Sequence, residues 1–408
     1  MPCVPLPLFR TLARPPFCDG LRSFCAYLEV IMRTIKFALL AFAITLFICP
    51  SGAGAAEAIR LGVPGAHTGD LAGYGTPALN AAKLVVEKYN AKGGINGRKI
   101  EIIQADDQCK PELSTNAATR LIAEKVDIIM GHTCSGANKA ALPMYEDKKI
   151  ISISPSATSP ELTQSGQFPH FFRTTASDDA QARLAVDFSL QALGAQKVAL
   201  LHDKGDYGKT YADFAKLFIE QEGSAKVVFF EGITPGAVDY STAVQKIARS
   251  GADTLIFGGY YPEASKLITS IKARKMKINF VSEDGVKTEA FLKLAGKDGE
   301  GVYASSSRDF SDLPVTKEAY EAHRKTFGTD PGQFFDNAYT ATLALLNAVE
   351  KADSTEPEAL KKALRAEYVE TPMGRIRFDE KGDCEGAGFA MFQVVDGKFV
   401  DQNFEAKK

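Results

Sequence analysis

Two short loops rich in hydroxyl side chains are the residues of this sequence best suited to chemistry. Thr133-Cys134-Ser135 and Ser154-Pro155-Ser156-Ala157-Thr158 each follow a short apolar run that predicts a buried strand, and each leads toward a predicted helix. Hydroxyl groups and the backbone amides of a helix N-terminus suit a carboxylate ligand. Ordinary helix capping explains any one of these residues alone. Two such loops at one sheet edge favour a binding site.

A complementary set of side chains follows later strands. Tyr207 and Tyr260 each come shortly after a predicted strand, and Glu283-Asp284 follow another. An acid that faces the hydroxyl loops would hold an ammonium group. Taken singly, a tyrosine is more often a packing residue, and an acidic pair more often lies in a solvated loop. Together they predict a cleft whose two walls bind opposite ends of one zwitterion.

The templates for catalysis and metal binding fail on this sequence. Gly-Lys-Thr at 208–210 lacks the first glycine of a phosphate-binding loop, because that position is Asp203. No G-x-S-x-G elbow is present. Cys134, two residues after His132, is a poor nucleophile in an exported chain that offers it a disulfide partner. No two histidines have the spacing of a zinc-binding pair; the five are His67, His132, His170, His202 and His323. We therefore expect no catalytic residue, no cofactor and no metal.

The elements that must position these loops alternate between strand and helix. In the first half, strands are predicted at 59–63, 100–103, 126–130 and 150–153, with helices at 79–89, 113–125 and 137–147 between them. After a break at 174–179, helices at 180–193, 209–222, 241–250 and 262–274 alternate with strands at 198–202, 227–230, 254–257 and 278–281. This order is typical of parallel sheets covered by helices on both faces. Two such units predict two lobes, because they do not fit comfortably into one sheet.

The C-terminal part contains no third unit of this kind. Helices are predicted at 315–327, 335–351 and 356–365, followed by a hairpin-like stretch from Gly374–Asp379 to Gly388–Val395. Such a tail is best used by returning to the two lobes already built. The chain would then cross between them more than once, which makes a hinge.

The N-terminal segment is typical of a secretory signal. Arg33 and Lys36 precede a twelve-residue apolar run, Phe37–Ile48, which is shorter than the roughly 20 residues that span a bilayer. Ala53-Gly54-Ala55 then fits a cleavage site. We expect residues 32–56 to be a signal peptide, with translation starting at Met32 and residues 1–31 a non-native extension. A buried core helix is one alternative, and a lipoprotein modified at Cys49 is another.

The charge left after cleavage excludes several classes of partner. About 352 residues remain, with 43 basic and 48 acidic side chains and a net charge of −5. This balance predicts no nucleic-acid surface and no polybasic membrane patch. No later segment is long and apolar enough for a transmembrane helix.

Three cysteines remain in the cleaved chain: Cys109, Cys134 and Cys384. One disulfide and one leftover thiol is the simplest pairing. Cys109 and Cys134 each follow a predicted strand, and neighbouring strand ends could bring them together. Cys384 lies in a polar turn and is predicted to be a free surface thiol.

Seven short motifs lie along the chain from about Glu57 to Val400: Tyr89–Gly97, Asp106–Cys109, Gly131–Ser135, Ser154–Thr158, His202–Gly208, Gly258–Tyr260 and Asp379–Asp383. Each motif is short, but their order and spacing are specific. On these motifs the chain resembles the periplasmic branched-chain amino acid binding proteins of ABC transporters, specifically the leucine/isoleucine/valine type.

The resemblance implies an α/β type I periplasmic binding protein fold: two doubly wound parallel-sheet lobes joined by a three-crossing hinge. We expect lobe 1 at 57–177 plus 307–388 and lobe 2 at 178–306 plus 389–402. The resemblance also pairs Cys109 with Cys134. It implies a periplasmic monomer that binds a small amino acid, docks on an ABC permease and catalyses nothing.

The resemblance places the ligand on specific residues of this sequence. The carboxylate and ammonium are expected on Ser135, the backbone at Ser156, and Thr158, with Asp284 as the acid that holds the ammonium. The walls around the ligand side chain are expected to be Tyr74, Tyr207, Tyr260 and Phe334.

Three departures from the family pattern affect the choice of ligand. Asp284 stands where the family usually has Glu, so Glu283 is an alternative ammonium ligand. Ser156 replaces Ala, and Thr133 replaces a frequent Leu near the side-chain pocket. A more polar wall leaves open another amino acid or an amide-type metabolite. A ligand-sensing receptor domain and an exported enzyme remain the rival classes.

Overall fold

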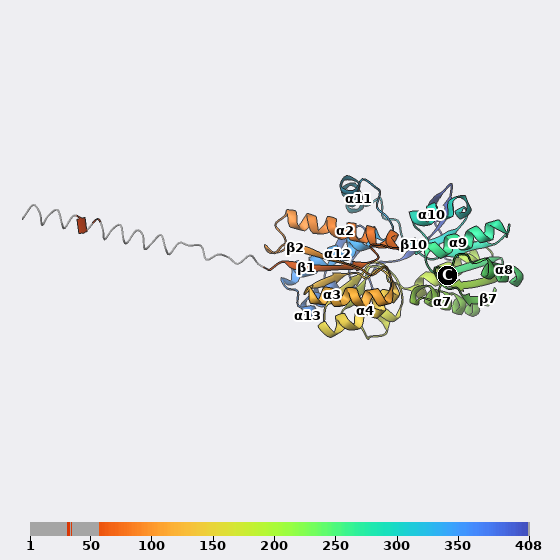
Figure 1. Cartoon of the computed structure of the whole chain (residues 1–408), viewed down its shortest axis with the longest axis horizontal. Helices are drawn as coiled ribbons and strands as arrows, with labels where there is room; N and C mark the ends of the chain where they lie inside the picture. Colours follow the sequence, from red (N-terminus) through yellow and green to blue (C-terminus); the bar gives the residue numbers. More distant parts are fainter. Residues whose placement is uncertain (1–30, 33, 35–56, 407–408) are drawn as a thin grey trace, which may run out of the picture. The chain divides into compact units, whose positions relative to one another are not determined.

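The computed structural model describes residues 31, 32, 34 and 57–406. Apart from Ile31, Met32 and Thr34, the predicted extension and signal peptide therefore lie outside the described residues. Residues 57–406 build two lobes, each around its own sheet (Figure 1).

The sheet of the first lobe has five parallel strands in the order β2-β1-β3-β4-β5. Their bounds are β1 Ile59–Gly65, β2 Ile100–Asp106, β3 Ile128–Met130, β4 Ile151–Ser154 and β5 Phe171–Arg173. The connecting helices are α2 Ala72–Ala91, α3 Pro111–Ala123, α4 Ser135–Lys148 and the single turn α5 Glu161–Gln164. Ile59, Leu61 and Val63 all enter the same core cluster, because side chains two apart on a strand share one face.

The sheet of the second lobe has seven strands in the order β14-β13-β10-β9-β8-β6-β7. Five are parallel: β6 Lys197–His202, β7 Lys226–Gly232, β8 Thr254–Gly258, β9 Asn279–Ser282 and β10 Tyr303–Ser307. β13 Phe389–Val395 and β14 Lys398–Asp401 add an antiparallel edge. The helices of this lobe are α6 Asp178–Gln191, α7 Asp206–Glu222, α8 Ser241–Ser250, α9 Tyr261–Ala273 and α10 Glu289–Ala295, followed by the 3₁₀ turn η1 Gly296–Gly299.

Helices cover both faces of the second sheet, as its strand sequences require. On β6, Val198 and Leu200 join the core under α6 and α7, whereas Ala199 and Leu201 join the core under α8 and α9. A parallel strand buried on both faces is apolar at every position. The strands of this sheet therefore read as short continuous apolar runs in the sequence, separated by the helices that cover them.

The C-terminal third returns to the first lobe before it ends in the second. α11 Pro314–Phe327, α12 Phe335–Ala352 and α13 Pro357–Ala366 follow β10, and α12 packs on α2, β3 and β4. The strands β11 Val369–Thr371 and β12 Gly374–Ile376 pair only with each other, and β13 then rejoins the second sheet. The chain crosses between the lobes three times, after β5, after β10 and after β12.

The predicted hairpin between Gly374–Asp379 and Gly388–Val395 is wrong. β12 pairs with β11, and β13 lies between β10 and β14 in the other lobe. The residues between them form the third crossing, where the buried Arg173 binds Asp383 with Nε 2.5 Å from Oδ1. The apolar alternation at 389–395 predicted a strand correctly, but alternation says nothing about which strand is its partner.

The predicted surface position of Cys384 is also wrong. The thiol is free but buried in the core of the first lobe, where burial raises its pKa to about 12. The polar residues around Cys384 stay near the surface, while the backbone turn directs the thiol inward. The backbones of Cys384 and Phe378 form an isolated antiparallel β-bridge.

Candidate ligand-binding site

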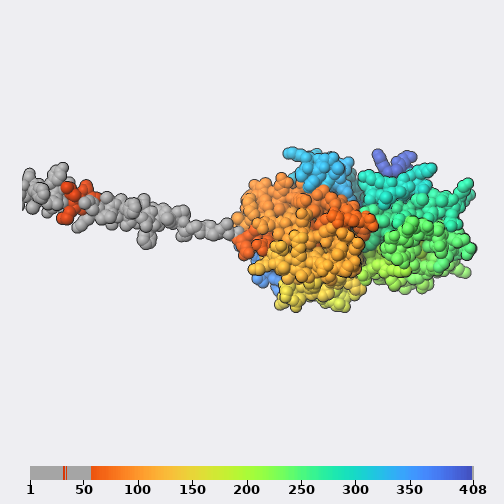
Figure 2. Space-filling view, in the orientation of Figure 1, coloured from red at the N-terminus to blue at the C-terminus, as the bar shows by residue number. Residues whose placement is uncertain are grey.

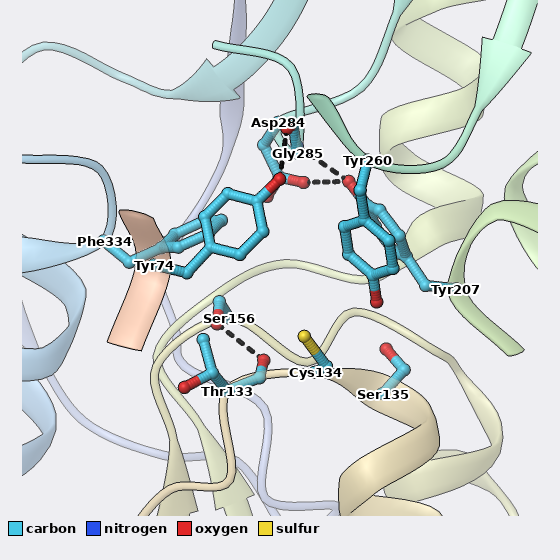
Figure 3. Close-up of a pocket in the computed structure, with 10 residues that line it drawn as sticks. All are labelled: Tyr74, Thr133, Cys134, Ser135, Ser156, Tyr207, Tyr260, Asp284, Gly285 and Phe334. Carbon is cyan, nitrogen blue, oxygen red and sulfur yellow. Dashed lines mark hydrogen bonds between the residues drawn. The ribbon is translucent and has the colours of Figure 1, made fainter. Parts of the chain in front are cut away.

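A small cavity lies between the lobes, where the carboxyl ends of strands from both sheets meet (Figure 3). It encloses about 10 Å³, about the space that holds one water molecule. The two walls are therefore almost in contact, and Figure 2 shows the lobes meeting along a common boundary. The lining residues are Tyr74, Thr133, Cys134, Ser135, Ser156, Tyr207, Tyr260, Asp284, Gly285 and Phe334.

The first-lobe wall is formed by the loop before α4 and the loop after β4. Ser135 begins α4 with Cys134 as its N-cap, so the free amides of the first helical turn lie beside its hydroxyl. Ser156 Oγ donates a hydrogen bond to the Thr133 carbonyl oxygen at 2.7 Å, which ties the two loops together. Of the residues predicted for this wall, the structure brings Thr133, Ser135 and Ser156 to the cavity.

A buried polar network behind this wall fixes the loop that carries Thr133 and Ser135. Asp107 Oδ2 lies 2.5 Å from His132 Nδ1, and Tyr145 Oη lies 2.9 Å from His132 Nε2. The Asn138 side chain accepts from the His132 amide at 3.1 Å and donates to its carbonyl oxygen at 2.8 Å. All four side chains are buried. Sequence reasoning considered His132 as a partner of Cys134 and as a possible zinc ligand, and missed this structural role.

Backbone geometry at Gly131 and a disulfide also hold the same loop. Gly131 has φ +134°, and a Cβ there would lie 2.3 Å from the Pro64 carbonyl oxygen, so only glycine fits. The predicted disulfide between Cys109 and Cys134 is confirmed, with Cα atoms 5.4 Å apart. It closes the wall from the side of β2.

The second-lobe wall is formed by Tyr207, Tyr260 and the segment after β9. Tyr207 Oη donates to Asp284 Oδ1 and accepts from the Gly285 amide at 2.9 Å (Figure 3). The rings of Tyr207 and Tyr260 stack with centroids 5.1 Å apart. α7 approaches the end of β8 closely, since a Cβ on Gly208 would lie 2.3 Å from the Gly258 carbonyl oxygen.

Tyr74 and Phe334 come from the first lobe but rest against the second. Both belong to the apolar cluster of the second lobe, and their rings lie 5.4 Å apart. Tyr74 Oη donates to the Gly285 carbonyl oxygen across the cleft. These two aromatic residues therefore close the cavity on the hinge side. Only the family resemblance predicted them, because neither follows a strand of its own sheet directly.

Three carboxyl groups are buried in or beside the second wall. Asp284 lines the cavity, and its Oδ2 has no hydrogen-bond partner among the described residues. Glu283 does not line the cavity; its Oε1 accepts from the Gly259 amide at 2.7 Å, and its Oε2 also lacks a partner within the described chain. Asp178, at the start of α6, is 0% exposed, and neither of its oxygens makes a regular hydrogen bond to the described residues.

Burial raises the pKa of all three groups, and repulsion by neighbouring acids adds to the shift at Asp178 and Glu283. Burial is the largest cause in each, and it raises the pKa of Asp178 to about 8 and that of Asp284 to about 6. The pKa of Glu283 is raised well above 4.5 by burial and then by Asp178 and Asp284. The nearby Thr158 hydroxyl and the Arg173 guanidinium lower the pKa of Asp178 only in part. This wall therefore attracts a cation or protons.

Sequence reasoning did not point to Asp178, and the structure places the predicted Thr158 behind the cavity lining. Asp178 lies in the break between the two series of predicted elements, and its acidic side chain at a helix start resembles an ordinary cap. Thr158 does not line the cavity; its hydroxyl is buried beside Asp178. The short chain path from the second hydroxyl loop, which ends at Thr158, to the first crossing is the signal that links the two residues.

The chain belongs to the periplasmic binding protein family, whose model matches residues 58–398. It is 34% identical over 355 residues to the Leu/Ile/Val-binding protein of Escherichia coli, covering 87% of this chain and 95% of that protein. It is 33% identical over 339 residues to the leucine-, isoleucine-, valine-, threonine-, and alanine-binding protein of Pseudomonas aeruginosa, covering 83% and 90%. The predicted family and type I fold are thus confirmed.

A solved structure supports the same assignment. The chain is similar to the branched-chain amino acid transporter substrate binding protein LivJ of Streptococcus pneumoniae in complex with isoleucine. The TM-score is 0.75 and the identity 26%, over 84% of this chain and 99% of that chain. Within residues 57–406, no helix is long and apolar enough to cross a membrane.

Proposed function

We propose that this protein captures an amino acid, preferably a branched-chain one, in the periplasm and delivers it to an ABC permease. The observation that carries the proposal is the contrast across the cavity: amides and hydroxyls on one wall, buried carboxyl groups with unpaired oxygens on the other. A free amino acid carries one charge for each wall. The names of the relatives point to the same ligand class.

The first-lobe wall would bind the ligand's carboxylate. The hydroxyl of Ser135, the free amides at the start of α4 and the backbone at Ser156 supply donors without a competing acid in the lining of this wall. An anion at a helix N-terminus is favoured by the amides and by the helix dipole. We also assign Thr133 to this wall, where its hydroxyl makes the pocket more polar than an aliphatic side chain would.

The second-lobe wall would bind the ligand's ammonium. Asp284 lies in the lining, so we assign the ammonium primarily to Asp284 and treat Glu283 as a supporting charge behind it. Asp178 and Thr158 lie on the side of the first crossing and complete the polar surroundings. A buried charge is tolerated only when it is paired and hydrogen-bonded, and an ammonium would supply the missing donors.

Ligand entry requires hinge motion, because the cavity in this structure is far smaller than an amino acid. Contacts between the lobes hold the walls together: Tyr74 Oη with the Gly285 carbonyl, Tyr261 Oη with the Asp70 carbonyl, and Lys139 Nζ 3.1 Å from Asp206 Oδ1. The three crossings would let the lobes part, and the ligand would then bridge them. The aromatic walls of Tyr74, Tyr207, Tyr260 and Phe334 would enclose its side chain. No bond is made or broken in this cycle, and the protein works as a monomer.

Ligand analogues test both walls at once. Purified protein freed of bound ligand is titrated with L-leucine, with L-leucinamide, which lacks the carboxylate, and with 4-methylpentanoate, which lacks the ammonium. L-leucine at 100 times its dissociation constant should stabilise the protein by about 2.7 kcal/mol in a thermal-shift assay. Each analogue should bind at least about tenfold more weakly, because it leaves buried polar groups unpaired.

A matched pair of variants assigns the ammonium site. Asp284→Asn should weaken L-leucine binding by about 100-fold or more, because the site loses its charge but keeps its shape. The control Asp312→Asn changes a fully exposed carboxylate and should bind normally. Unchanged affinity of Asp284→Asn with a large loss in Glu283→Gln would move the ammonium to Glu283. Binding of 4-methylpentanoate as tight as that of L-leucine would instead favour the alternative of a ligand without an ammonium.

A further inference from the structure

A second, larger cavity lies on the hinge side of the site described above. It has a volume of about 470 Å³ and is lined by both lobes: α10 and the β13–β14 edge on one side, and α11 and the start of α12 on the other. α10 and α11 flank the boundary between the lobes on this side (Figure 1). Phe334 lines both cavities, and Gln333 donates to the Asp284 carbonyl oxygen at 3.2 Å. These two residues form the partition between them.

Lys287 supplies a cation to this cavity without an anionic partner. Its side chain is partly buried, and its Nζ lies 4.5 Å from the centroid of the Phe392 ring. It forms no hydrogen bond or ion pair with any of the described residues. Burial lowers the pKa of Lys287, and the negative charges of Asp309, Asp336, Asp401 and Glu289 oppose that shift. An ammonium held this way gains stability from any anion that binds beside it.

Asp336 supplies an anion from the other lobe. Its Oδ2 accepts a hydrogen bond from Tyr320 Oη at 2.8 Å, while its Oδ1 is shut off from solvent and has no partner in the described part of the chain. Burial raises the pKa of Asp336 to about 6, although Tyr320 and Lys287 both lower it. Asp336 lines the cavity, so an ammonium bound there would lie beside its carboxyl group.

The two charges face the same cavity but do not pair with each other. Lys287 and Asp336 belong to different lobes and form no ion pair, so neither charge is neutralised by direct contact with the other. The other charged residues that line the cavity are two cations, Arg308 and Lys398, and two anions, Glu289 and Asp309. Their charges cancel, so they do not favour a ligand with a net positive or a net negative charge. Phe335, Phe392 and Phe399 give the cavity an apolar surface between the charges.

We infer that this cavity is a second ligand site, for a free amino acid whose carboxylate binds Lys287 and whose ammonium binds Asp336. A single ion would satisfy only one of the two side chains, whereas a zwitterion satisfies both. The ligand would join the two lobes from the hinge side. It would therefore favour the arrangement of lobes seen here, and each site would tighten the other by the same factor.

Thermal-shift panels of the twenty amino acids separate the two sites. The panel is run on Asp284→Ala, which weakens the cleft site, and on the double variants Asp284→Ala/Lys287→Met and Asp284→Ala/Lys277→Met. We expect at least one amino acid to stabilise Asp284→Ala, the Lys287→Met change to weaken that binding about tenfold or more, and Lys277→Met to leave it unchanged. Lys277 is exposed and lies outside both cavities, so it is a matched control.

A further variant protects the test against a folding defect in Lys287→Met. Asp336→Asn changes the other charge at constant size and should weaken the same residual binding. Acetate and methylammonium, which carry one charge each, should both bind more weakly than the amino acid that stabilises Asp284→Ala. The inference is wrong if none of the twenty amino acids stabilises Asp284→Ala. It is also wrong if the residual binding survives both Lys287→Met and Asp336→Asn. Loss of binding in the cleft leaves this result unaffected, so the two proposals fail separately.

Discussion

The two walls of the cleft solve the problem of buried polar groups in opposite ways. In the first-lobe wall, Asp107, His132, Asn138 and Ser156 hydrogen-bond to one another or to the loop backbone, and the disulfide adds a covalent tie. In the second-lobe wall, Glu283 and Asp284 each keep one oxygen without a hydrogen-bond partner among residues 57–406, and Asp178 beside them keeps two.

We call the first-lobe wall, whose polar groups are hydrogen-bonded within the protein, the prepared wall. We call the second-lobe wall, whose carboxyl groups keep unpaired oxygens among the described residues, the incomplete wall. A wall whose hydrogen bonds are satisfied internally keeps its shape in the open form and costs little to reorganise when ligand arrives. A wall with unpaired carboxyl groups is costly until protons or an ammonium reach it. Ligand binding should therefore change the energetics of the second lobe far more than those of the first.

The largest expected effect is on the prepared wall. Asp107→Ala removes the partner of His132 and the acceptor of the Cys109 amide, which lies 2.7 Å from Asp107 Oδ1. Leaving a buried group unpaired in such a network should lower the free energy of unfolding by about 3–5 kcal/mol. Urea denaturation of the oxidised protein measures this loss.

The neighbouring residue provides the control for this prediction. Asp106, the last residue of β2 and the residue just before Asp107, is exposed and accepts hydrogen bonds from the His67 and Thr68 amides. Asp106→Ala should cost about 1 kcal/mol. Equal losses from the two variants would show that the buried network does not hold the wall, and the contrast between the walls would then disappear.

The pH dependence of stability probes the incomplete wall. An acid with a higher pKa in the folded than in the unfolded chain keeps its proton more tightly when folded, so its stabilisation is complete at low pH and is lost as pH rises. With pKa values of about 8 for Asp178 and about 6 for Asp284, the ligand-free protein should lose stability as pH rises from about 4 to about 8. Each such proton changes the slope by up to about 1.4 kcal/mol per pH unit.

Ligand and substitution should each flatten that profile. A bound ammonium stabilises the ionised Asp284, and Asp178→Asn removes one titrating group altogether. Asp203 and Asp336, whose pKa values are also raised by burial, remain as a background of the same sign. Stability that is independent of pH above 5 in the ligand-free wild-type protein would mean that these carboxyl groups are ionised and satisfied in some other way.

The smallest expected effect is at Ser156. Ser156→Ala removes only the hydrogen bond from Oγ to the Thr133 carbonyl, while the backbone proposed to bind the carboxylate stays in place. Stability should fall by about 0.5–1.5 kcal/mol and ligand affinity by less than about tenfold. Isothermal titration with L-leucine measures the second quantity. A loss as large as that of Asp284→Asn would show that the hydroxyl itself binds the ligand.

Much of the fold was predictable because it is encoded locally. Apolar alternation and helical spacing predicted most of the βα units of both lobes to within a few residues, for example 241–250 for α8, although α2 begins seven residues before the predicted start at 79. The short elements β5, β10, β11, β14 and α10 were missed, because three to seven residues carry little periodic signal. The partner of β13 was wrong, because pairing depends on distant segments.

The site was predictable in part. Loops at strand ends predicted Ser135, Tyr207, Tyr260 and Asp284 as neighbours, and the structure brings them to one cavity. Tyr74 and Phe334 came only from the family resemblance. Asp178, His132 and Thr158 act through burial and through partners far away in the chain, which no single segment reveals.

The sequence by itself determined which segments form helices and strands, which loops carry hydroxyl or acidic groups, and which family the chain resembles, because each depends on residues close together in the chain. The tertiary structure alone decided which carboxyl groups are buried without a partner among the described residues, which lobe Tyr74 rests against, and that Lys287 and Asp336 line one cavity. Solvent exposure and charge pairing depend on what packs against a group, and those neighbours come from distant parts of the chain.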